Sequence, residues 1–223
     1  MSETKKLFDR IQSGEVGDLY FQTIHGFDIE EFVQLMKPRI VQTSGADYAI
    51  AMHKDDPTDC SDRTDYFDWH SDGLYHVKPP RFVLLHCLDP GEGLVKTELV
   101  ETIQVLSTLE YRHFKILQKL SSCYIGHGGW YEHPILMGDQ HREMLLASRG
   151  HVRALPNIRL EDQPSIRQIS EALVALYRSL DSMWVVRIGQ QGDTIIFDQY
   201  KYMHRRNSAT VDKKRKLIRM WWS

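Results

Sequence analysis

The sequence has few cysteines, no long apolar run and almost no net charge, and each of these absences excludes a class of protein. Its three cysteines, Cys60, Cys87 and Cys123, are an odd number without C-x-x-C spacing. That pattern argues against a disulfide framework or a zinc ribbon and is typical of a reducing compartment. No stretch approaches the roughly 18 apolar residues of a membrane-spanning helix, and the N-terminus lacks a signal-peptide core. We therefore expect a soluble, cytoplasmic protein.

The charge balance gives no reason to expect a polyanionic partner. The 223 residues carry a formal net charge of −2, so we expect neither nucleic acid nor a membrane surface as a partner. A composition of 42% hydrophobic and 26% charged residues is that of an ordinary globular protein. No repeat, linker or shift in composition divides the chain. We predict one domain over residues 1–223, with a small-molecule substrate and with homo-oligomer formation left open.

The first half of the chain alternates helix-like and strand-like segments. We predict a helix over residues 3–12, a strand over 19–24, and a helix that begins after Asp28 as its N-cap. The polar segment 43–68 is predicted as a loop, and the apolar run “RFVLLHCL” as a buried strand. The residues that come before this strand, His70 among them, would then lie at the edge of a sheet.

The second half predicts more helix, then a strand-rich end. Residues 101–120 read as one helix or two short ones, and “WYEHPIL” with “EMLLAS” as a hairpin. An amphipathic helix follows, with Pro164 in its first turn. The runs “MWVVRIG”, “DTIIFDQ” and “KLIRMWW” are typical of short strands. Strands at both ends with helices between them predict a helix-supported β-sandwich or barrel.

A histidine followed two residues later by a carboxylate is half of a metal site, and the sequence has three such pairs. They lie at residues 53–55, 70–72 and 141–143, and spacing alone does not separate them. Only the middle pair is followed by a predicted buried strand; 53–55 lies in the most polar loop and 141–143 in a predicted hairpin turn. The apolar, strand-flanked setting that a water-excluding metal site needs therefore favours His70 and Asp72.

An Fe(II) site that activates O2 usually takes two histidines and one carboxylate, which leaves positions for substrates. In an extended segment residues i and i+2 point the same way, so His70 and Asp72 can both be ligands. The best third ligand is His204, which follows the predicted strand “DTIIFDQ”. Arg215 and Arg219 are four apart on the last predicted strand, so both guanidinium groups could enter one cavity and bind a dicarboxylate. The alternative is a solvated basic strand.

Two blocks of the sequence resemble those of a known family. “WHSDGLYHVKPPRFVLLHCLDPGEGLVKTELVET” and “GDTIIFDQYKYMHRR…RKLIR” are similar to the signature blocks of the taurine dioxygenase and clavaminate synthase-like Fe(II)/2-oxoglutarate-dependent oxygenases, which include carbapenem synthase. The resemblance covers residues 18–222. It implies a mainly β fold with supporting helices, the double-stranded β-helix (a cupin-like jelly roll) with helices packed on one side.

The resemblance also implies roles for individual residues. The iron ligands would be His70, Asp72 and His204. Thr97 and Arg215 would bind a carboxylate of 2-oxoglutarate, and Arg219 and Tyr66 would face the primary substrate. The sequence departs from the family pattern where “GEGLVK” precedes the threonine without two adjacent glycines, and where Asp198-Gln199 stands in place of Asp-Asn. Its N-terminus is also short.

The function implied is an oxygenase that uses Fe(II), 2-oxoglutarate and O2 and releases succinate and CO2. Halogenating relatives replace the carboxylate ligand with a small residue, so Asp72 favours hydroxylation, desaturation or ring formation. A small polar substrate, such as an amino acid or a derivative from secondary metabolism, is the leading expectation. Two alternatives stay open: a hydroxylase of protein or peptide residues, and a jelly-roll binding module without catalysis.

Overall fold

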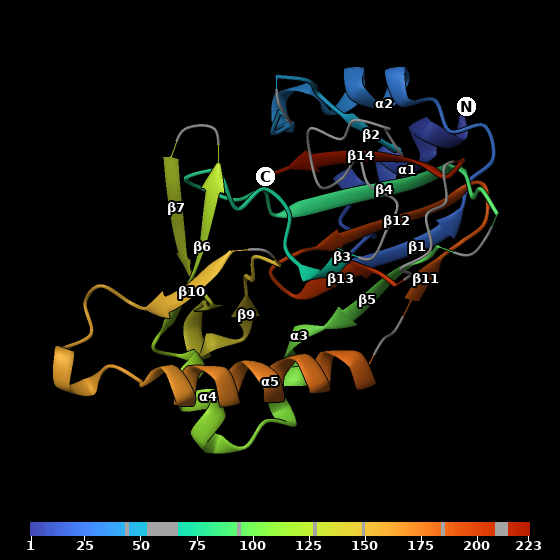
Figure 1. Ribbon diagram of the computed structural model, residues 1–223. Helices are drawn as coiled ribbons and strands as arrows, with labels where there is room; N and C mark the ends of the chain where they lie inside the picture. Colours follow the sequence, from blue (N-terminus) through green and yellow to red (C-terminus); the bar gives the residue numbers. More distant parts are fainter. Residues whose placement is uncertain are drawn as a thin grey trace.

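Two antiparallel sheets packed face to face form the centre of the computed structural model, which describes residues 1–42, 45–52, 67–92, 95–126, 129–148, 150–183, 186–207 and 214–223 (Figure 1). The larger sheet has the order β1-β12-β4-β14-β2, formed by Leu19–Thr23, Asp193–Asp198, Phe82–Asp89, Lys216–Trp222 and Ala49–Met52. The smaller sheet has the order β11-β5-β13-β3, formed by Val186–Ile188, Thr97–Glu101, Tyr202–Arg206 and Phe67–His70. This is the arrangement expected of a jelly roll.

The strand β12 shows how the sequence builds these layers. All six of its residues are buried. Successive side chains of a strand point to opposite faces, so Ile195 and Phe197 join the core between the two sheets, while Ile196 joins the core on the outer face of the larger sheet. A strand that is covered on both faces needs a continuous apolar run, and “DTIIFD” supplies it.

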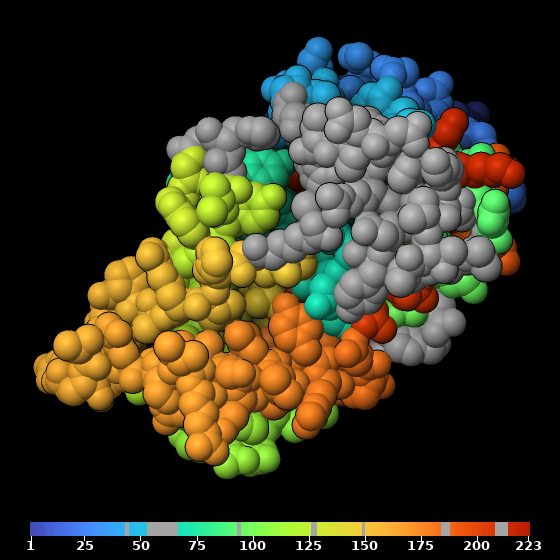
Figure 2. All heavy atoms as spheres, in the orientation of Figure 1, coloured from blue at the N-terminus to red at the C-terminus, as the bar shows by residue number. Residues whose placement is uncertain are grey.

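Helices cover the outer faces of both sheets, whereas the resemblance implied helices on one side only. Helices α1 (Glu3–Gln12) and α2 (Ile29–Met36) pack on the larger sheet. Helices α3 (Thr102–Ser107), α4 (Tyr111–Leu117) and α5 (Ile166–Ser182) pack on the smaller one, where Trp69, Val100 and Met203 meet Leu176 and Leu180. The blue N-terminal helices and the orange α5 lie at opposite ends of the molecule in Figure 2.

The helix ends confirm the sequence predictions, with one correction. Asp28 caps α2 by accepting a hydrogen bond from the backbone N–H of Glu31. Helix α5 begins after Ser165, whose hydroxyl and the Gln168 side chain form a reciprocal capping box. Pro164 therefore precedes the N-cap and does not lie in the first turn.

The middle of the chain differs most from the prediction. Strand β7 (Gly129–Pro134) pairs with β6 (Leu120–Gly126), and β10 (His151–Ala154) extends this pair to a third sheet, β10-β6-β7. Of the predicted hairpin, only the short pair of β8 (Leu136–Met137) and β9 (Glu143–Met144) is present. Within the described ranges the chain also forms three short 3-10 helices: η1 (Lys37–Arg39), η3 (Asp139–His141) and η4 (Leu160–Asp162).

The sequence analysis also missed strands β2 and β13. Strand β2 lies inside the segment 43–68 that was predicted as a loop, and β13 lies directly after β12. Neither has a long apolar run; β13 is “YMHRR”, whose polar side chains are buried or half-buried. Among the described residues, no helix is long and apolar enough to cross a membrane.

Candidate active site

His70, Asp72 and His204 meet between the two sheets. His70 is the last residue of β3 and is paired directly with His204 on β13, so their rings lie 4.1 Å apart, centroid to centroid. Asp72 lies in the turn after β3 and not on the strand itself, which corrects the extended geometry that the sequence suggested. Ser71, between the two, bonds to the backbone of Leu146: its N–H donates to the carbonyl oxygen of Leu146, and its hydroxyl accepts from the N–H of Leu146 over 3.4 Å.

The turn that carries Asp72 depends on the glycine that follows it. Gly73 has φ +66°, a conformation that is strained for other residues. A Cβ atom at this position would lie 2.6 Å from Cδ of Pro80. The motif “HSDG” therefore needs glycine both for the backbone conformation and for space.

The three side chains form a compact donor set. One ligand atom from each lies within 4.8 Å of the others, and their exposed fractions are only 5–6%. Nε2 of His70 lies 3.5 Å from Oδ1 of Asp72, and Nε2 of His204 lies 3.8 Å from Oδ2. Among the described residues no other group of three such side chains qualifies, and residues 53–55 lie outside the described residues.

Hydrogen bonding fixes which nitrogen of His70 is available to a metal. Its Nδ1 lies 2.7 Å from the carbonyl oxygen of Asp68. A carbonyl only accepts, so Nδ1 carries the proton and Nε2 presents its lone pair toward Asp72. Within the described part of the chain, Nδ1 of His204 is buried without a hydrogen-bond partner.

The charge states also suit a divalent cation. Burial raises the pKa of the Asp72 carboxyl, but Arg219, His204 and His70 outweigh it, and the pKa lies well below its usual value. Burial and the neighbouring His70 lower the pKa of His204 to about 3, so this imidazole is neutral at neutral pH. Neutral imidazole nitrogen and ionised carboxylate oxygen are the donors of a two-histidine, one-carboxylate iron site. The residues therefore fit Fe(II).

Three residues hold Asp72 in place, and the sequence analysis predicted this role for none of them. Nε1 of Trp221 donates to Oδ2 of Asp72 over 3.0 Å, and Nη1 of Arg219 lies 3.4 Å from Oδ1. The buried amide of Gln199 accepts from the backbone N–H of Asp72 over 2.6 Å and donates to its carbonyl oxygen over 3.0 Å and to that of Pro80. The Gln199 amide thereby fixes the backbone of the ligand-bearing turn.

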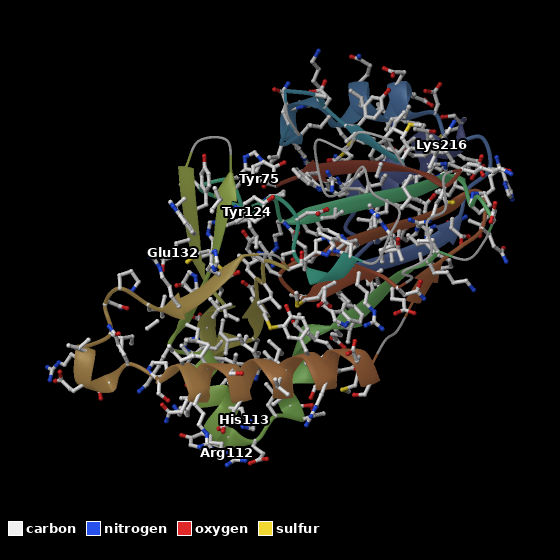
Figure 3. The ribbon with its side chains drawn as sticks, viewed as in Figure 1. Tyr75, Arg112, His113, Tyr124, Glu132 and Lys216 are labelled. Atoms are coloured by element: carbon white, nitrogen blue, oxygen red, sulfur yellow. The ribbon has the colours of Figure 1, made fainter. Side chains whose placement is uncertain are left out.

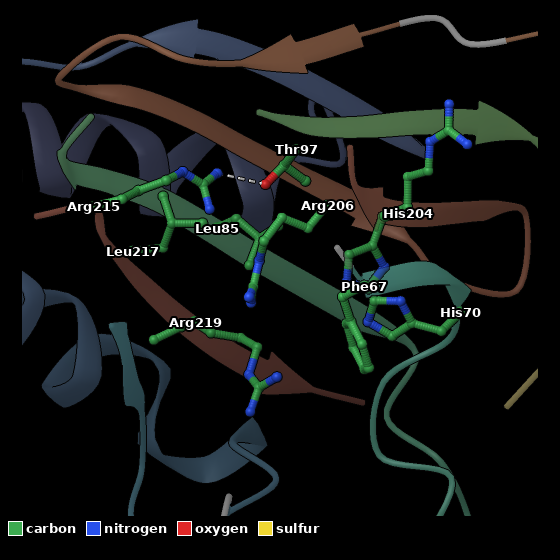
Figure 4. A pocket seen from close by; sticks show the side chains of 11 residues that line it. Phe67, His70, Leu85, Thr97, His204, Arg206, Arg215, Leu217 and Arg219 are labelled. Carbon is green, nitrogen blue, oxygen red and sulfur yellow. Dashed lines mark hydrogen bonds between the residues drawn. The ribbon is translucent and has the colours of Figure 1, made fainter. Parts of the chain in front are cut away.

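Arginines line the pocket beside this donor set (Figure 4). Nη2 of Arg215 donates to the hydroxyl of Thr97 over 2.8 Å, and both side chains are buried. Arg215 directly precedes β14 and Thr97 begins β5, not a turn as the sequence suggested. The pocket is lined by Ala51, Phe67, His70, Leu85, Thr97, His204, Arg205, Arg206, Arg215, Leu217 and Arg219.

The structure thus brings together six of the seven predicted site residues. One pocket is lined by five of them: His70, Thr97, His204, Arg215 and Arg219. The sixth, Asp72, contacts His70, His204 and Arg219. Tyr66 lies outside the described residues. Both arginines face the same pocket, as predicted, although Arg215 lies just before β14 and only Arg219 lies on the strand. Arg215 is 5% exposed and the side chain of Arg219 is 11% exposed, so neither belongs to a solvated basic strand.

Solved structures with this fold include several oxygenases. PvcB of Pseudomonas aeruginosa superimposes with a TM-score of 0.72 at 18% identity, over 100% of this chain and 82% of that one. An asparagine oxygenase, in complex with Fe(II), 3-hydroxyasparagine and succinate, gives 0.70 at 16% identity over 98% and 78%. The non-haem iron oxygenase OrfP, bound to Fe and α-ketoglutaric acid, gives 0.69 at 15% identity over 98% and 80%. These likenesses confirm the jelly-roll fold.

Sequence comparison identifies the family. No curated protein sequence matches the chain closely enough to count as a relative. The profile of the family described as “Taurine catabolism dioxygenase TauD, TfdA family” matches residues 25–221, which span both signature blocks and all six described site residues. The chain therefore belongs to the TauD/TfdA family and is a 2-oxoglutarate-dependent non-haem iron dioxygenase.

Proposed function

We propose that this pocket oxidises an amino acid or a small derivative of one. The observation that carries the proposal is the placement of two features in one pocket: a buried His70–Asp72–His204 donor set and the buried Arg215–Thr97 pair. The first suits Fe(II), and the second suits a carboxylate, because a planar guanidinium and a hydroxyl are both donors to carboxylate oxygens. A dicarboxylic keto acid such as 2-oxoglutarate would join the two, with its keto end at the metal and its far carboxylate at Arg215 and Thr97.

When bound, Fe(II) supplies the oxidative chemistry, in which O2 and 2-oxoglutarate are converted with the substrate to oxidised product, succinate and CO2. The protein supplies binding and orientation. Arg215 and Thr97 hold the far carboxylate of 2-oxoglutarate, and Trp221 and Gln199 hold Asp72 in position to act as a ligand. The apolar side chains of Leu85, Leu217 and Phe67 exclude water from the same pocket.

Arg219 is the proposed anchor for the primary substrate. Its guanidinium contacts Oδ1 of Asp72 at 3.4 Å and lies 4.7 Å from the ring centroid of Trp221. Nε is buried without a hydrogen-bond partner among the described residues. A guanidinium has five donor hydrogens, so one contact to Asp72 leaves others for a substrate carboxylate.

Trp221, which lies beside Arg219, is the first of a row of aromatic side chains that supports a small organic substrate. Tyr75 lies 6.0 Å from Trp221 and 6.1 Å from Tyr124 between ring centroids, and both tyrosines are labelled in Figure 3. The solved neighbours favour amino acids: one asparagine oxygenase is bound to 3-hydroxyasparagine, and an OrfP mutant is bound to 3-hydroxy-L-arginine. Asp72 as a carboxylate ligand supports hydroxylation, desaturation or ring formation.

The proposal treats residues 1–223 as one domain. It is supported by the pocket, which takes residues from Ala51 in β2 to Arg219 in β14 and so draws on most of the chain. A cytoplasmic location, a role in secondary metabolism and assembly into homo-oligomers belong to the same proposal. The cysteines Cys87 and Cys123 are free and buried, which suits a reducing compartment.

The test is succinate formation from 2-oxoglutarate with Fe(II) and ascorbate, measured across a panel of free amino acids. We expect at least one amino acid to raise succinate formation well above the rate without it, with an oxidised product of that amino acid formed in step with succinate. Stimulation only by peptides would favour the peptide hydroxylase. The absence of succinate from a folded, iron-loaded protein would favour the binding module.

A further inference from the structure

Strand β3 contains one residue more than the strand beside it. Phe67 and His70 are three positions apart, yet both line the pocket (Figure 4). In a regular strand, residues separated by an odd number of positions point to opposite faces. The register accounts for the exception. Phe67 is paired with Arg206, whereas His70, three positions later, is paired with His204, only two positions earlier. Two residues of β3 therefore face one residue of β13, and this β-bulge turns His70 toward the pocket.

The two bulge residues, Asp68 and Trp69, make hydrogen bonds within β3. The backbone N–H of Trp69 donates to Oδ1 of Asp68 over 2.7 Å, and the carbonyl oxygen of Asp68 accepts from Nδ1 of His70 over 2.7 Å. A bulge disrupts the hydrogen bonds between two strands locally. These bonds shape the bulge but do not connect it to β13, so contacts of another kind must fix the two strands against each other.

One oxygen of Asp181 makes that connection from the side of helix α5. Oδ1 of Asp181 accepts from Nε1 of Trp69 over 3.0 Å and also from Nη1 of Arg205. Trp69 comes directly before His70, and Arg205 directly after His204. The guanidinium of Arg205 also lies 4.4 Å from the ring centroid of Trp69. Asp181 thereby joins the neighbours of both histidines.

Arg205 is fixed from a third strand as well. Its Nε donates to Oε2 of Glu98 on β5 over 2.8 Å, and the side-chain amide of Asn207 donates to Oε1 of Glu98 over 2.8 Å. Glu98 is 3% exposed and the side chain of Arg205 14%. Hydrogen bonds between charged groups are stronger than neutral ones, and more so away from water. The guanidinium is therefore a firm support for the oxygen of Asp181.

The position of Asp181 in its helix also needs a tertiary explanation. Asp181 lies in the last turn of α5, where the unpaired carbonyl groups make a negative charge unfavourable. Helix formation therefore does not account for an aspartate here, whereas the bridge to β3 and β13 does. Glu171 of the same helix differs, because it pairs with Arg167 one turn away, on the exposed side of α5.

We propose that Asp181 is a positioning residue for the metal site, which acts through Trp69 and Arg205 to fix the bulge and so the direction of His70. The inference rests on the proposed function, because it assumes that His70 and His204 bind iron. Such a site needs its ligands held within about 0.5 Å of their working geometry. Without the bridge, the bulge loosens and His70 no longer keeps its place beside His204.

Binding of Co(II), as a spectroscopic probe for Fe(II), tests this role without turnover. Metal-free unaltered protein, Asp181→Ala and Asp181→Asn are titrated with Co(II) and followed by calorimetry and by visible absorption, which depends on the geometry of the ligands. Alanine removes the bridge, whereas asparagine keeps an oxygen that can accept from both donors. We expect Asp181→Ala to weaken Co(II) binding about 10-fold and to alter the spectrum, and Asp181→Asn to recover most of both.

Glu171→Ala is the matched control, because it removes a carboxylate and an ion pair from the same helix; it should keep the affinity and the spectrum of the unaltered protein. Thermal unfolding of each variant verifies the fold. Unchanged affinity and spectrum in Asp181→Ala would overturn the proposal. So would equal effects of alanine and asparagine, which would indicate charge alone, or equal effects of Asp181→Ala and Glu171→Ala. If the unaltered protein binds no Co(II), the proposed function itself fails and this inference fails with it.

Discussion

The indole nitrogen of Trp221 donates a 3.0 Å hydrogen bond to Oδ2 of Asp72, and both side chains are buried. The residue that orients the carboxylate ligand therefore comes from β14, almost 150 positions later in the chain. Arg219, two residues before Trp221 on the same face of β14, contacts the other oxygen. One strand thus supplies a donor to each oxygen of the proposed ligand.

Replacing Trp221 with phenylalanine should weaken metal binding. The variant keeps an aromatic ring but loses the N–H that holds Oδ2, and partners of this kind are typically worth 10–100-fold in metal affinity. Calorimetric titration of the metal-free protein with Fe(II) or Co(II) measures the change. Trp222→Phe is the control, because Trp222 stacks on Phe82 on the outer face of the sheet. Equal affinities for both variants would contradict an orienting role.

Arg219→Ala should impair binding of the primary substrate more than binding of 2-oxoglutarate. The substitution removes the proposed carboxylate donor while the Arg215–Thr97 pair stays intact. For the amino acid that best stimulates succinate formation, we expect KM to rise at least 10-fold, with a much smaller change in KM for 2-oxoglutarate. If turnover persists and KM for that amino acid does not change, Arg219 does not face the substrate.

Gly73→Ala should both destabilise the protein and displace Asp72. The left-handed backbone costs roughly 1–2 kcal/mol for alanine, and the new Cβ would lie 2.6 Å from Cδ of Pro80. Gly26→Ala separates the two effects, because Gly26 has φ +73° and nothing lies within 4 Å of its Cβ position. Chemical denaturation should show a larger loss for Gly73→Ala, and only this variant should lose metal affinity. Similar losses in both would mean that Pro80 moves aside easily.

Stability without metal should fall as the solution is acidified. Burial lowers the pKa of His86 to about 4, below its ordinary value of 6.5, so the unfolded chain binds the proton first. The resulting stability is present above about pH 6.5 and is lost as the pH falls toward 4.

For His86 we expect a loss of about 1–2 kcal/mol in the free energy of unfolding between pH 6.5 and 4.5. Urea denaturation in the presence of a chelator measures this loss. Burial also lowers the pKa of His204, to about 3, so His204 adds to the fall in the free energy of unfolding as the pH decreases. His86→Gln should have a flatter profile than the unaltered protein. A profile as steep as that of the unaltered protein would show that His86 is not responsible.

The sequence predicted the elements whose signals are local. Helices α1 and α2, the capping at Asp28 and the buried strand β4 follow from spacing, capping chemistry and apolar runs in adjacent residues. Strand β13 was missed because “YMHRR” has no apolar run: its burial comes from β5 and β3 on either side and from α5 beneath. Tertiary contacts therefore override the weak local preference of this segment.

The residues of the site also fall into two groups, those that the sequence indicates and those that only the folded structure reveals. Six residues could be brought together from motif spacing and family resemblance, because they occupy positions that match the signature blocks of the family. Trp221 and Gln199 could not, because their roles depend on register and on contacts between distant segments. Trp221 had one usable signal, its position two residues after Arg219 on a strand, which predicts the same face. Gln199 stood out only as a departure from the Asp-Asn pattern.

The most direct test of the account is the charge-transfer absorption of the Fe(II) and 2-oxoglutarate complex, measured without O2 in the unaltered protein and in Asp72→Ala. We predict a visible band that saturates with one Fe(II) and one 2-oxoglutarate for each unaltered chain, and a band that is absent or far weaker in a folded Asp72→Ala. A folded, unaltered protein that develops no band, or an Asp72→Ala variant that develops the same band at the same concentrations, would contradict the central claim that His70, Asp72 and His204 hold the iron.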